Sequence, residues 1–262
     1  NKEKLLGFRK AGINRLSIGV QTCMDNELEA LGRMHSYSDA EKTVLDAYEV
    51  GFDNISCDLM LGIQYQTMES LKYSVDKLCG LPITHISAYM LKIEKGTPFY
   101  AQNISDFLPD EDTVCDMYLF CVEELKKNGF YQYEISNFAK ENKVSKHNMK
   151  YWLCDEYIGI GPSAHSFFYG KRYRVPNDLE MFICEPLQNE IITDKNPDLR
   201  KDKVMLGLRL TEGVEISDIA DKMPIKAYEK SGLAHMRDGK VSLTPKGFLV
   251  SNMIISDIIS FM

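Results

Sequence analysis

The chain has no pair of cysteines at the spacing that binds a metal cluster. Its seven cysteines include no C-x-x-C or C-x-x-x-C pair, so neither a zinc knuckle nor an iron–sulfur loop is visible in the sequence. None of them lies in a local motif with a histidine and an orienting acid, which a nucleophilic thiol would need. We therefore expect most of them to be reduced thiols that pack in the core.

A long apolar run and an excess of positive charge are also missing. No segment approaches the roughly 20 apolar residues that a bilayer span needs, and the first residues, Asn1 to Lys4, lack the apolar core of a signal peptide. We expect no transmembrane segment and a cytoplasmic location. The formal net charge of −7 argues against nucleic acid or an anionic membrane as the main partner.

What the sequence does contain is a row of βα units. Three apolar stretches, each ending on a polar or charged side chain, span residues 14–21, 54–60 and 85–92. Helical patterns accompany them at residues 4–11, 38–51, 67–80 and 110–128. The strands should therefore run parallel, and their C-terminal ends, with Gln21, Asp58 and Lys92, should gather on one face.

This pattern predicts an α/β fold built on a partial parallel (βα) barrel. Only a short amphipathic segment precedes the first unit, so about half of a barrel is accounted for. The second helix should start at a capping box formed by Ser38 and Glu41. Residues 130–175 are rich in aromatic, glycine and β-branched residues, which favours short strands and loops over another βα unit.

The last part of the chain changes character and predicts a second domain. Asn196 and Pro197 open a helix, residues 216–231 read as two short helices, and a hairpin with an Asp238-Gly239 turn precedes a final helix from Thr244 to the end. This order is typical of a winged-helix-like α+β domain. We predict two domains, residues 1–194 and residues 195–262.

Winged-helix modules often read DNA, but the charge of this one argues against that use. From residue 197 onward there are 10 Lys and Arg residues against 9 Asp and Glu residues, whereas contact with phosphates needs a clustered positive face. A regulatory winged-helix module on a half barrel remains an alternative of another class.

Gln21, Arg33 and Asp58 form the first candidate site. A carboxylate would accept hydrogen bonds from ribose hydroxyls or an amine, a guanidinium would pair with a carboxylate, and an amide would supply one donor and one acceptor. Together they could hold a zwitterionic, hydroxyl-rich small molecule. The alternative is a buried ion pair that ties a loop to a strand.

His147, Asn148, Tyr151 and Trp152 form the second candidate site. Histidine can ligate haem iron, and Trp and Tyr offer flat apolar area to a macrocycle, so the group suits a porphyrin. His165, in a glycine-rich stretch, is the alternative ligand. The alternative role for His147 and Asn148 is to hydrogen-bond a loop against the mouth of the barrel. The other histidines, His35, His85 and His235, we interpret as surface or packing residues.

Seven segments resemble one family, the oxygen-independent coproporphyrinogen III oxidases, and within it the HemW branch of haem chaperones. They are NRLSIGVQ (14–21), LGRMHS (31–36), DLMLGIQYQ (58–66), YEISNFA (133–139), HNMKYW (147–152), GIGPSAHS (159–166) and GLRL (207–210). The resemblance implies the second half of a radical S-adenosylmethionine barrel. It places Gln21, Arg33, Asp58 and Lys92 at positions that contact S-adenosylmethionine, and it ties residues 147–152 to haem.

The chain departs from this family in one respect. The family binds a [4Fe–4S] cluster through a C-x-x-x-C-x-x-C loop, and no such loop is present, so this chain supplies no metal ligands for the cluster. We therefore expect a C-terminal portion of a longer protein that is inactive alone as a radical enzyme. The first strand would then have a free edge, through which the chain could self-associate.

The resemblance leads to one main interpretation and one rival from the same family. The main interpretation is a haem-binding protein that delivers haem to acceptor proteins, with S-adenosylmethionine and a [4Fe–4S] cluster as the family's cofactors. The rival is an oxidase that converts coproporphyrinogen III to protoporphyrinogen IX by oxidative decarboxylation of two propionates. Formation of that product by the full-length protein would distinguish them.

Overall fold

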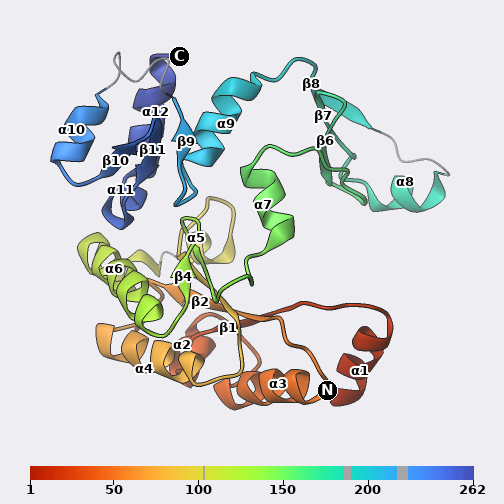
Figure 1. Ribbon diagram of the computed structural model, residues 1–262. Helices are drawn as coiled ribbons and strands as arrows, with labels where there is room; N and C mark the ends of the chain where they lie inside the picture. Colours follow the sequence, from red (N-terminus) through yellow and green to blue (C-terminus); the bar gives the residue numbers. More distant parts are fainter. Residues whose placement is uncertain (103, 186–189, 217–223) are drawn as a thin grey trace. The chain divides into compact units, whose positions relative to one another are not determined.

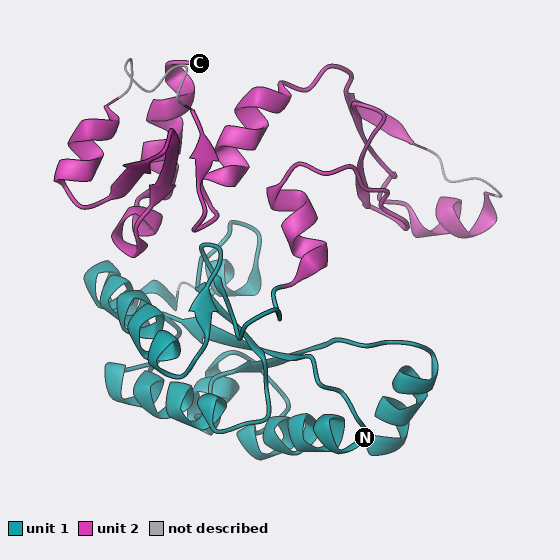
Figure 2. Ribbon diagram, viewed as in Figure 1, with its two compact units in different colours: residues 1–144 teal, residues 145–262 magenta. Residues whose placement is uncertain are grey.

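The computed structural model describes residues 1–102, 104–185, 190–216 and 224–262. These residues form two compact units, Asn1–Val144 and Ser145–Met262 (Figure 2). The boundary that we predicted between residues 194 and 195 lies inside the second unit. Each unit has its own buried apolar residues and its own sheets, and we describe each by itself.

The first unit is built on a five-stranded sheet with the order β1-β2-β3-β5-β4. The strands are β1 (Leu16–Gln21), β2 (Ile55–Leu61), β3 (His85–Met90), β4 (Tyr131–Gln132) and β5 (Asn137–Ala139). The first three run parallel, as the βα pattern predicts, whereas β5 runs antiparallel to β3 and to β4. The parallel sheet is thus confirmed, and among the described residues it does not close into a barrel.

The first unit contains seven described helical segments in all. They are α1 (Lys2–Lys10), α2 (Asp25–Ala30), α3 (Tyr37–Glu49), α4 (Met68–Cys79), α5 (Pro98–Ala101), the 3₁₀ helix η1 (Ile104–Phe107) and α6 (Glu111–Lys127). Of these, α3 and α4 lie on one side of the sheet (Figure 1). α3 packs on β1 and β2, and α6 packs on β2 and β3 and beside α4. The apolar positions of β2 and β3 that face these helices are fully buried, namely Ile55, Cys57, Leu59, Leu61, Ile86 and Ala88. Burying one Leu or Ile side chain contributes about 1.5–3 kcal/mol, so this layer contributes several times that amount to the unit's stability.

Helix boundaries follow from local capping, and one of them differs from the prediction. Thr67 and Asp110 cap α4 and α6 as expected. α3, however, begins at Tyr37, because Ser36 and not Ser38 is its N-cap. The Asp39 carboxylate accepts from the Ser36 backbone N–H at 2.9 Å, and the Ser36 hydroxyl accepts from the Asp39 N–H at 3.3 Å. Asp39 completes the capping box that the sequence pattern assigned to Glu41.

The second unit contains two small antiparallel sheets with the orders β6-β7-β8 and β10-β11-β9. Its strands are β6 (His165–Phe168), β7 (Lys171–Arg174), β8 (Ile191–Asp194), β9 (Val214–Glu215), β10 (Ala234–Arg237) and β11 (Lys240–Leu243). Its helices are α7 (Lys146–Trp152), α8 (Leu179–Cys184), α9 (Leu199–Gly207), α10 (Ile225–Lys230), α11 (Pro245–Leu249) and α12 (Ser251–Ser260). Short strands between residues 130 and 175 are therefore confirmed.

The predicted hairpin is present and has the expected turn. β10 pairs with β11 from Ala234↔Leu243 to Arg237↔Lys240. Asp238 and Gly239 have φ values of 50° and 79°. Positive φ at both central residues defines a type I′ turn, whose twist matches that of the strands, and an Asp-Gly pair adopts it readily.

Two other predictions for the last part of the chain turn out differently. One of the two short helices expected in residues 216–231 is α10, and the other would fall on residues that lie outside the described part. The final helix is interrupted at Val250, whose φ and ψ of −115° and 21° are not helical. The segment that we predicted as one helix is therefore two helices. Each of them buries apolar side chains, Phe248 on α11 and Ile254 on α12.

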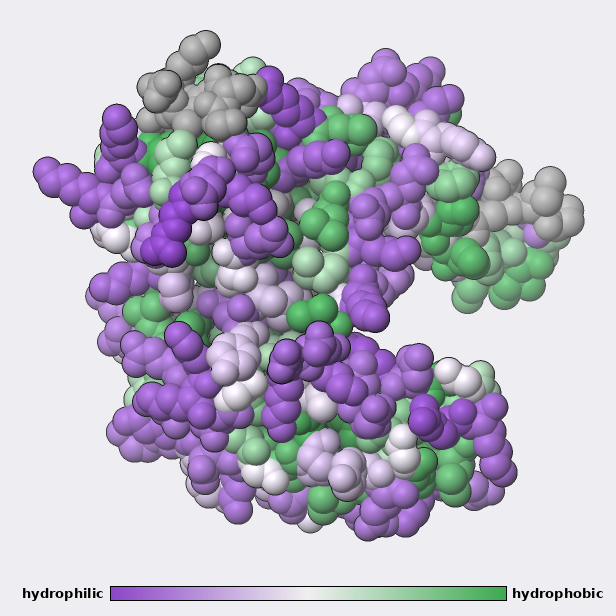
Figure 3. Space-filling model, in the orientation of Figure 1, coloured by the Kyte–Doolittle hydropathy of each residue, from purple (hydrophilic) through white to green (hydrophobic). Residues whose placement is uncertain are grey.

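Exposed apolar side chains gather around α8 (Figure 3). Leu179 and Ile183 on this helix and Ile191 and Ile192 on β8 are all exposed. In the described part of the chain, no helix combines the length and the apolar character that crossing a bilayer requires.

Candidate functional site

The face of the first sheet that carries polar residues holds a row of four positions across four strands. Gly19 of β1 pairs with Asp58 of β2, Asp58 pairs with Ser87 of β3, and Ser87 pairs with Asn137 of β5. Residues that pair across neighbouring strands point to the same face. The sheet therefore brings a carboxylate, a hydroxyl and an amide together from segments that lie far apart in the sequence.

Asp58 is the charged member of this row. Its Oδ1 atom lies 3.3 Å from the Ser17 hydroxyl, which donates to it. Burial raises the pKa of the Asp58 carboxyl, while hydrogen bonds from Ser87 and Ser17 and the positive charge of Arg15 oppose this shift. The carboxylate is thus half-buried and held by hydroxyls, with capacity left to accept hydrogen bonds from a ligand.

Gln21 lies on the same face beside this row. It is 7% exposed and has a φ of 70°, at the point where the register between β1 and β2 shifts. Its Nε2 atom lies 2.7 Å from the point where a Cβ on Gly19 would be, so the side chain folds back over Gly19. Because Gly19 is the partner of Asp58, the Gln21 amide lies over the strand next to Asp58. A left-handed conformation is uncommon for a residue other than glycine and marks a functional constraint in many proteins.

Arg33 and Lys92 are not joined to this pair. Arg33 lies exposed in the loop between α2 and α3, and within the described residues no hydrogen bond or ion pair connects it to Asp58 or Gln21. The Lys92 side chain is 81% exposed and forms an ion pair with Glu94 at 2.7 Å. The structure thus brings together two of the four predicted residues. The alternative of a buried ion pair between Arg33 and Asp58 is wrong for this structure.

The sequence pattern singled out neither Arg15 nor Asn137 on this face, and it left His85 as a surface or packing residue. Among the residues that the structure describes, the buried Arg15 Nε and Asn137 Oδ1 atoms have no hydrogen-bond partner. His85, interpreted as a packing residue, is 1% exposed, with Nδ1 at 2.7 Å from the Ser56 hydroxyl and Nε2 at 2.8 Å from the Tyr133 hydroxyl. Burial and, to a smaller degree, Arg15 lower the pKa of His85 to about 3. The alternation of side chains along a strand could have placed Arg15 on this face, because it lies two residues before Ser17. No local pattern in the sequence marks Asn137 as a residue of this face.

The second candidate site lies on α7, in the second unit. His147 and Tyr151 are four residues apart, and the His147 Nε2 atom is 2.9 Å from the Tyr151 hydroxyl. Their rings meet edge to face with centroids 5.2 Å apart, and Tyr151 in turn meets Tyr157 at 4.6 Å. His147, Asn148 and Tyr151 are exposed and Trp152 is half-buried. The hydrogen bond of His147 therefore stays within its own helix, and α7 presents an imidazole and aromatic rings to solvent.

His165 does not belong to this cluster. It begins β6, opposite Arg174, and its side chain is exposed. In the described part of the chain, it forms no hydrogen bond or ring contact with His147 or Tyr151. Within the described residues, His165 is thus separate from the His147–Tyr151 pair.

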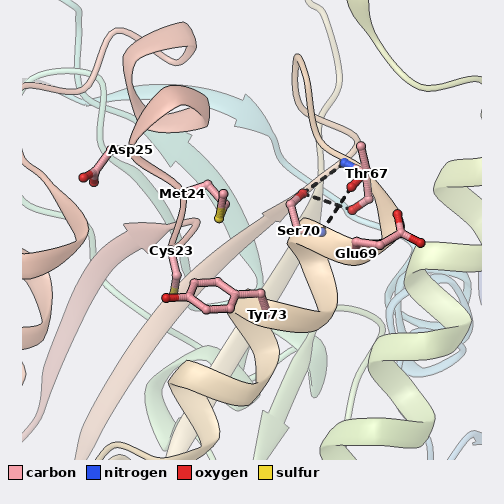
Figure 4. Close-up of a pocket in the computed structure, with 7 residues that line it drawn as sticks. All are labelled: Cys23, Met24, Asp25, Thr67, Glu69, Ser70 and Tyr73. Carbon is pink, nitrogen blue, oxygen red and sulfur yellow. Dashed lines mark hydrogen bonds between the residues drawn. The ribbon is translucent and has the colours of Figure 1, made fainter.

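A cavity of about 620 Å³ lies between the start of α2 and the first turns of α4 (Figure 4). It is lined by Cys23, Met24, Asp25, Thr67, Glu69, Ser70 and Tyr73. Burial raises the pKa of the Cys23 thiol to about 12, so this cysteine is an unreactive thiol at neutral pH. None of the predicted site residues lines this cavity.

A second cavity of about 490 Å³ is lined by Ile93, Phe99, Tyr100, Ile104 and Ser105. It too contains no predicted site residue. Within the described residues, no group of three or more His, Cys, Asp or Glu side chains is arranged to hold a metal ion.

Comparison with known proteins identifies two family models in the chain. The model of the radical SAM superfamily matches residues 1–78, and the model of the HemN C-terminal domain matches residues 195–250. Over its whole length the chain matches part of the structure of coproporphyrinogen III oxidase (HemN) from Escherichia coli, with a TM-score of 0.78 and 19% identity, and the match covers 68% of that protein. The fold is thus shared with that protein.

Three relatives illustrate the similarity in sequence. The heme chaperone HemW of Bacillus subtilis is 34% identical over 96% of this chain, and that of Lactococcus lactis is 32% identical over 93%. A mouse protein named radical S-adenosyl methionine domain-containing protein 1, mitochondrial, is 44% identical over 63% of this chain. The chain spans 71%, 68% and 38% of these three relatives, in the same order.

Proposed function

Because the chain belongs to the HemN/HemW family of the radical SAM superfamily, we propose that it binds haem on the surface of α7 and delivers it to acceptor proteins. The observation that carries this proposal is the His147–Tyr151 pair, exposed on α7 beside Tyr157. Flat aromatic area and groups able to ligate iron are what a porphyrin needs from a protein. The names of the two HemW relatives support the same assignment.

The charge of α7 also suits haem. Its sequence, KHNMKYW, holds Lys146 and Lys150 and no acidic residue. Lysine side chains at this surface would pair with the propionates of haem, which are anionic at neutral pH. Exposed pairs of this kind contribute about 0.2–1 kcal/mol each, so they orient the porphyrin more than they hold it.

We further propose that the polar face of the first sheet holds S-adenosylmethionine. That molecule carries a ribose and an amino acid head, and the groups on this face fit both. The Asp58 carboxylate and the Asn137 Oδ1 atom, which has no partner among the described residues, can accept from hydroxyls or the amine, and Gln21 can donate from its amide. The exposed Arg33 side chain is free to pair with the carboxylate, whereas Lys92 is committed to Glu94 and is the weaker candidate.

In the radical SAM superfamily, S-adenosylmethionine together with a [4Fe–4S] cluster supplies a carbon radical. This chain has no C-x-x-x-C-x-x-C motif. Its own residues would therefore bind and orient S-adenosylmethionine, and the cluster ligands would have to come from elsewhere.

On the fold, we propose that the open parallel sheet is part of a radical SAM barrel and that residues 195–262 form a winged-helix-like domain. The parallel order of β1 to β3 and the β10–β11 hairpin support this assignment. The boundary between residues 194 and 195, the cytoplasmic location and self-association through the outer edge of β1 stay predictions.

A haemin titration tests the haem proposal directly. Haemin is added to the chain and the Soret band is followed, in the wild type, in a His147→Ala/Tyr151→Phe double variant and in a control that changes another exposed histidine of the same unit, His235→Ala. We expect a stoichiometric shifted band in the wild type and the control, and a loss of at least about tenfold in affinity in the double variant. A band that survives the double variant but disappears in His165→Ala would place haem at β6 instead.

The oxidase alternative predicts a different result. If the porphyrin is a substrate and not a cargo, the full-length protein converts coproporphyrinogen III to protoporphyrinogen IX, and haemin shows no stoichiometric band. The regulatory alternative predicts DNA binding that weakens steeply with salt. Neither outcome is expected from a protein that carries haem.

A further inference from the structure

The hydrogen bond between His147 and Tyr151 restricts which of the two can ligate iron. The His147 Nε2 atom and the Tyr151 hydroxyl are 2.9 Å apart, and the spacing of four residues on one helix keeps them neighbours. When the ring proton is on Nδ1, Nε2 is the acceptor and the phenol is the donor. The Nε2 lone pair is then engaged, whereas the phenol oxygen still has lone pairs that face away from the bond.

We propose that Tyr151 supplies the oxygen atom that ligates ferric haem iron, and that His147 is the positioning residue that accepts the phenol proton. This inference rests on the proposed function and deepens it, since it names the ligand and the oxidation state of the cargo. Tyrosine is an established class of axial ligand to haem iron, and an anionic oxygen is a hard ligand that favours Fe(III) over Fe(II).

The step is balanced without any redox partner. A bond forms between Tyr151 Oη and Fe(III), and the O–H bond of the phenol breaks. The proton moves to His147 Nε2, which leaves an imidazolium hydrogen-bonded to the bound phenolate. The water or chloride that occupied the axial position of haemin leaves, and no electron is transferred.

Two cationic side chains lie near the ring cluster to which Tyr151 belongs. Burial raises the pKa of the neighbouring Tyr157 phenol, with a further contribution from Tyr151, while Arg172 opposes the shift, so this cation lies near the ring cluster. Arg172 is itself paired with Asp202 at 2.6 Å. Lys150 precedes Tyr151 directly on α7. Positive charge near an iron-bound phenolate oxygen stabilises that oxygen.

The ring contact with Tyr157 gives the phenol a fixed direction. The two rings meet at 78° with centroids 4.6 Å apart, and the His147 ring meets Tyr151 at 87°. Tyr151 therefore lies between two rings that hold it edge to face. A ligand held in this way is already oriented before haem binds, which lowers the entropic cost of coordination.

Resonance Raman spectroscopy of the ferric complex tests the assignment. Haemin is bound to the wild type, to Tyr151→Phe, to His147→Ala and to Tyr169→Phe, a control that removes a more exposed phenol of the same unit. We expect iron-bound phenolate modes in the wild type and the control. Tyr151→Phe should lose these modes and at least about tenfold in affinity, while keeping its far-UV circular dichroism. His147→Ala should keep the modes at weaker affinity.

Reduction gives an independent readout. Anaerobic addition of dithionite should weaken haem binding in the wild type, because Fe(II) binds phenolate poorly, and should change the affinity of Tyr151→Phe much less. Stoichiometric haem binding with unchanged spectra in Tyr151→Phe, or with the low-spin spectrum of imidazole ligation, would overturn this inference and leave the proposed function standing. Absence of stoichiometric binding in the wild type would overturn both.

Discussion

The two candidate sites are built in opposite ways. On the first sheet, Asp58, Ser87 and Asn137 come from three strands and meet only through strand pairing, and several of their neighbours are buried. On α7, His147 and Tyr151 come from one short helix, meet through helical spacing alone and are exposed. A site of the first kind is fixed before its ligand arrives and depends on the whole unit. A site of the second kind is local, and it leaves its faces free for a large flat cargo and for transfer to a partner.

The largest effect should come from removing a buried side chain of the first unit, because the site on its sheet depends on the packing of the whole unit. Leu59→Ala empties a fully buried position on the helix-covered face of β2 and should lower the free energy of unfolding of the first unit by about 2–5 kcal/mol. The exposed Leu45→Ala on α3 is the matched control and should change it by less than about 0.5 kcal/mol. Urea denaturation followed by circular dichroism measures both. Equal effects of the two substitutions would mean that this layer does not determine stability.

Acid should weaken the first unit through His85. Since burial lowers its pKa in the folded state to about 3, the unfolded chain takes up a proton first, near pH 6.5. The stabilisation is complete above pH 6.5 and is lost as pH falls toward 3, at up to about 1.4 kcal/mol per pH unit. Urea denaturation between pH 7 and 4 should show this slope in the wild type and lose part of it in His85→Gln. His235→Ala, which removes an exposed histidine, should retain it.

Asp58 should show a conflict between stability and ligand binding. Because burial raises the pKa of its carboxyl, ionisation destabilises the folded state, so Asp58→Asn should be more stable than the wild type at pH 7. The gain should vanish below about pH 4, where the carboxyl is protonated in both states. Calorimetric titration should show at least about tenfold weaker binding of S-adenosylmethionine. The exposed Asp53→Asn is the control, and a similar loss of affinity in that variant would argue against a site at Asp58.

Much of the fold could be predicted because it is encoded locally. Amphipathic spacing gave α4 and α6 with their caps, and the Asp238-Gly239 pair gave the hairpin, since a type I′ turn needs residues that accept positive φ. The capping box of α3 was assigned two residues too late because Ser36 and Ser38 both have an acidic residue three positions on. A choice between two such boxes depends on where the chain enters the helix.

The two candidate sites also differ in how much of each the local sequence encodes. The sequence by itself determined the α7 cluster, because a helix places residues four apart side by side whatever the rest of the chain does. It also named Asp58 and Gln21. Only the tertiary structure decided that Asn137 lies beside Ser87, that His85 is buried between two hydroxyls and that Arg33 and Lys92 stand apart from Asp58. The register of strands whose paired residues lie 29 positions apart, as Asp58 and Ser87 do, or 50 positions apart, as Ser87 and Asn137 do, is set by how a whole sheet buries its apolar face, and no local pattern records that outcome.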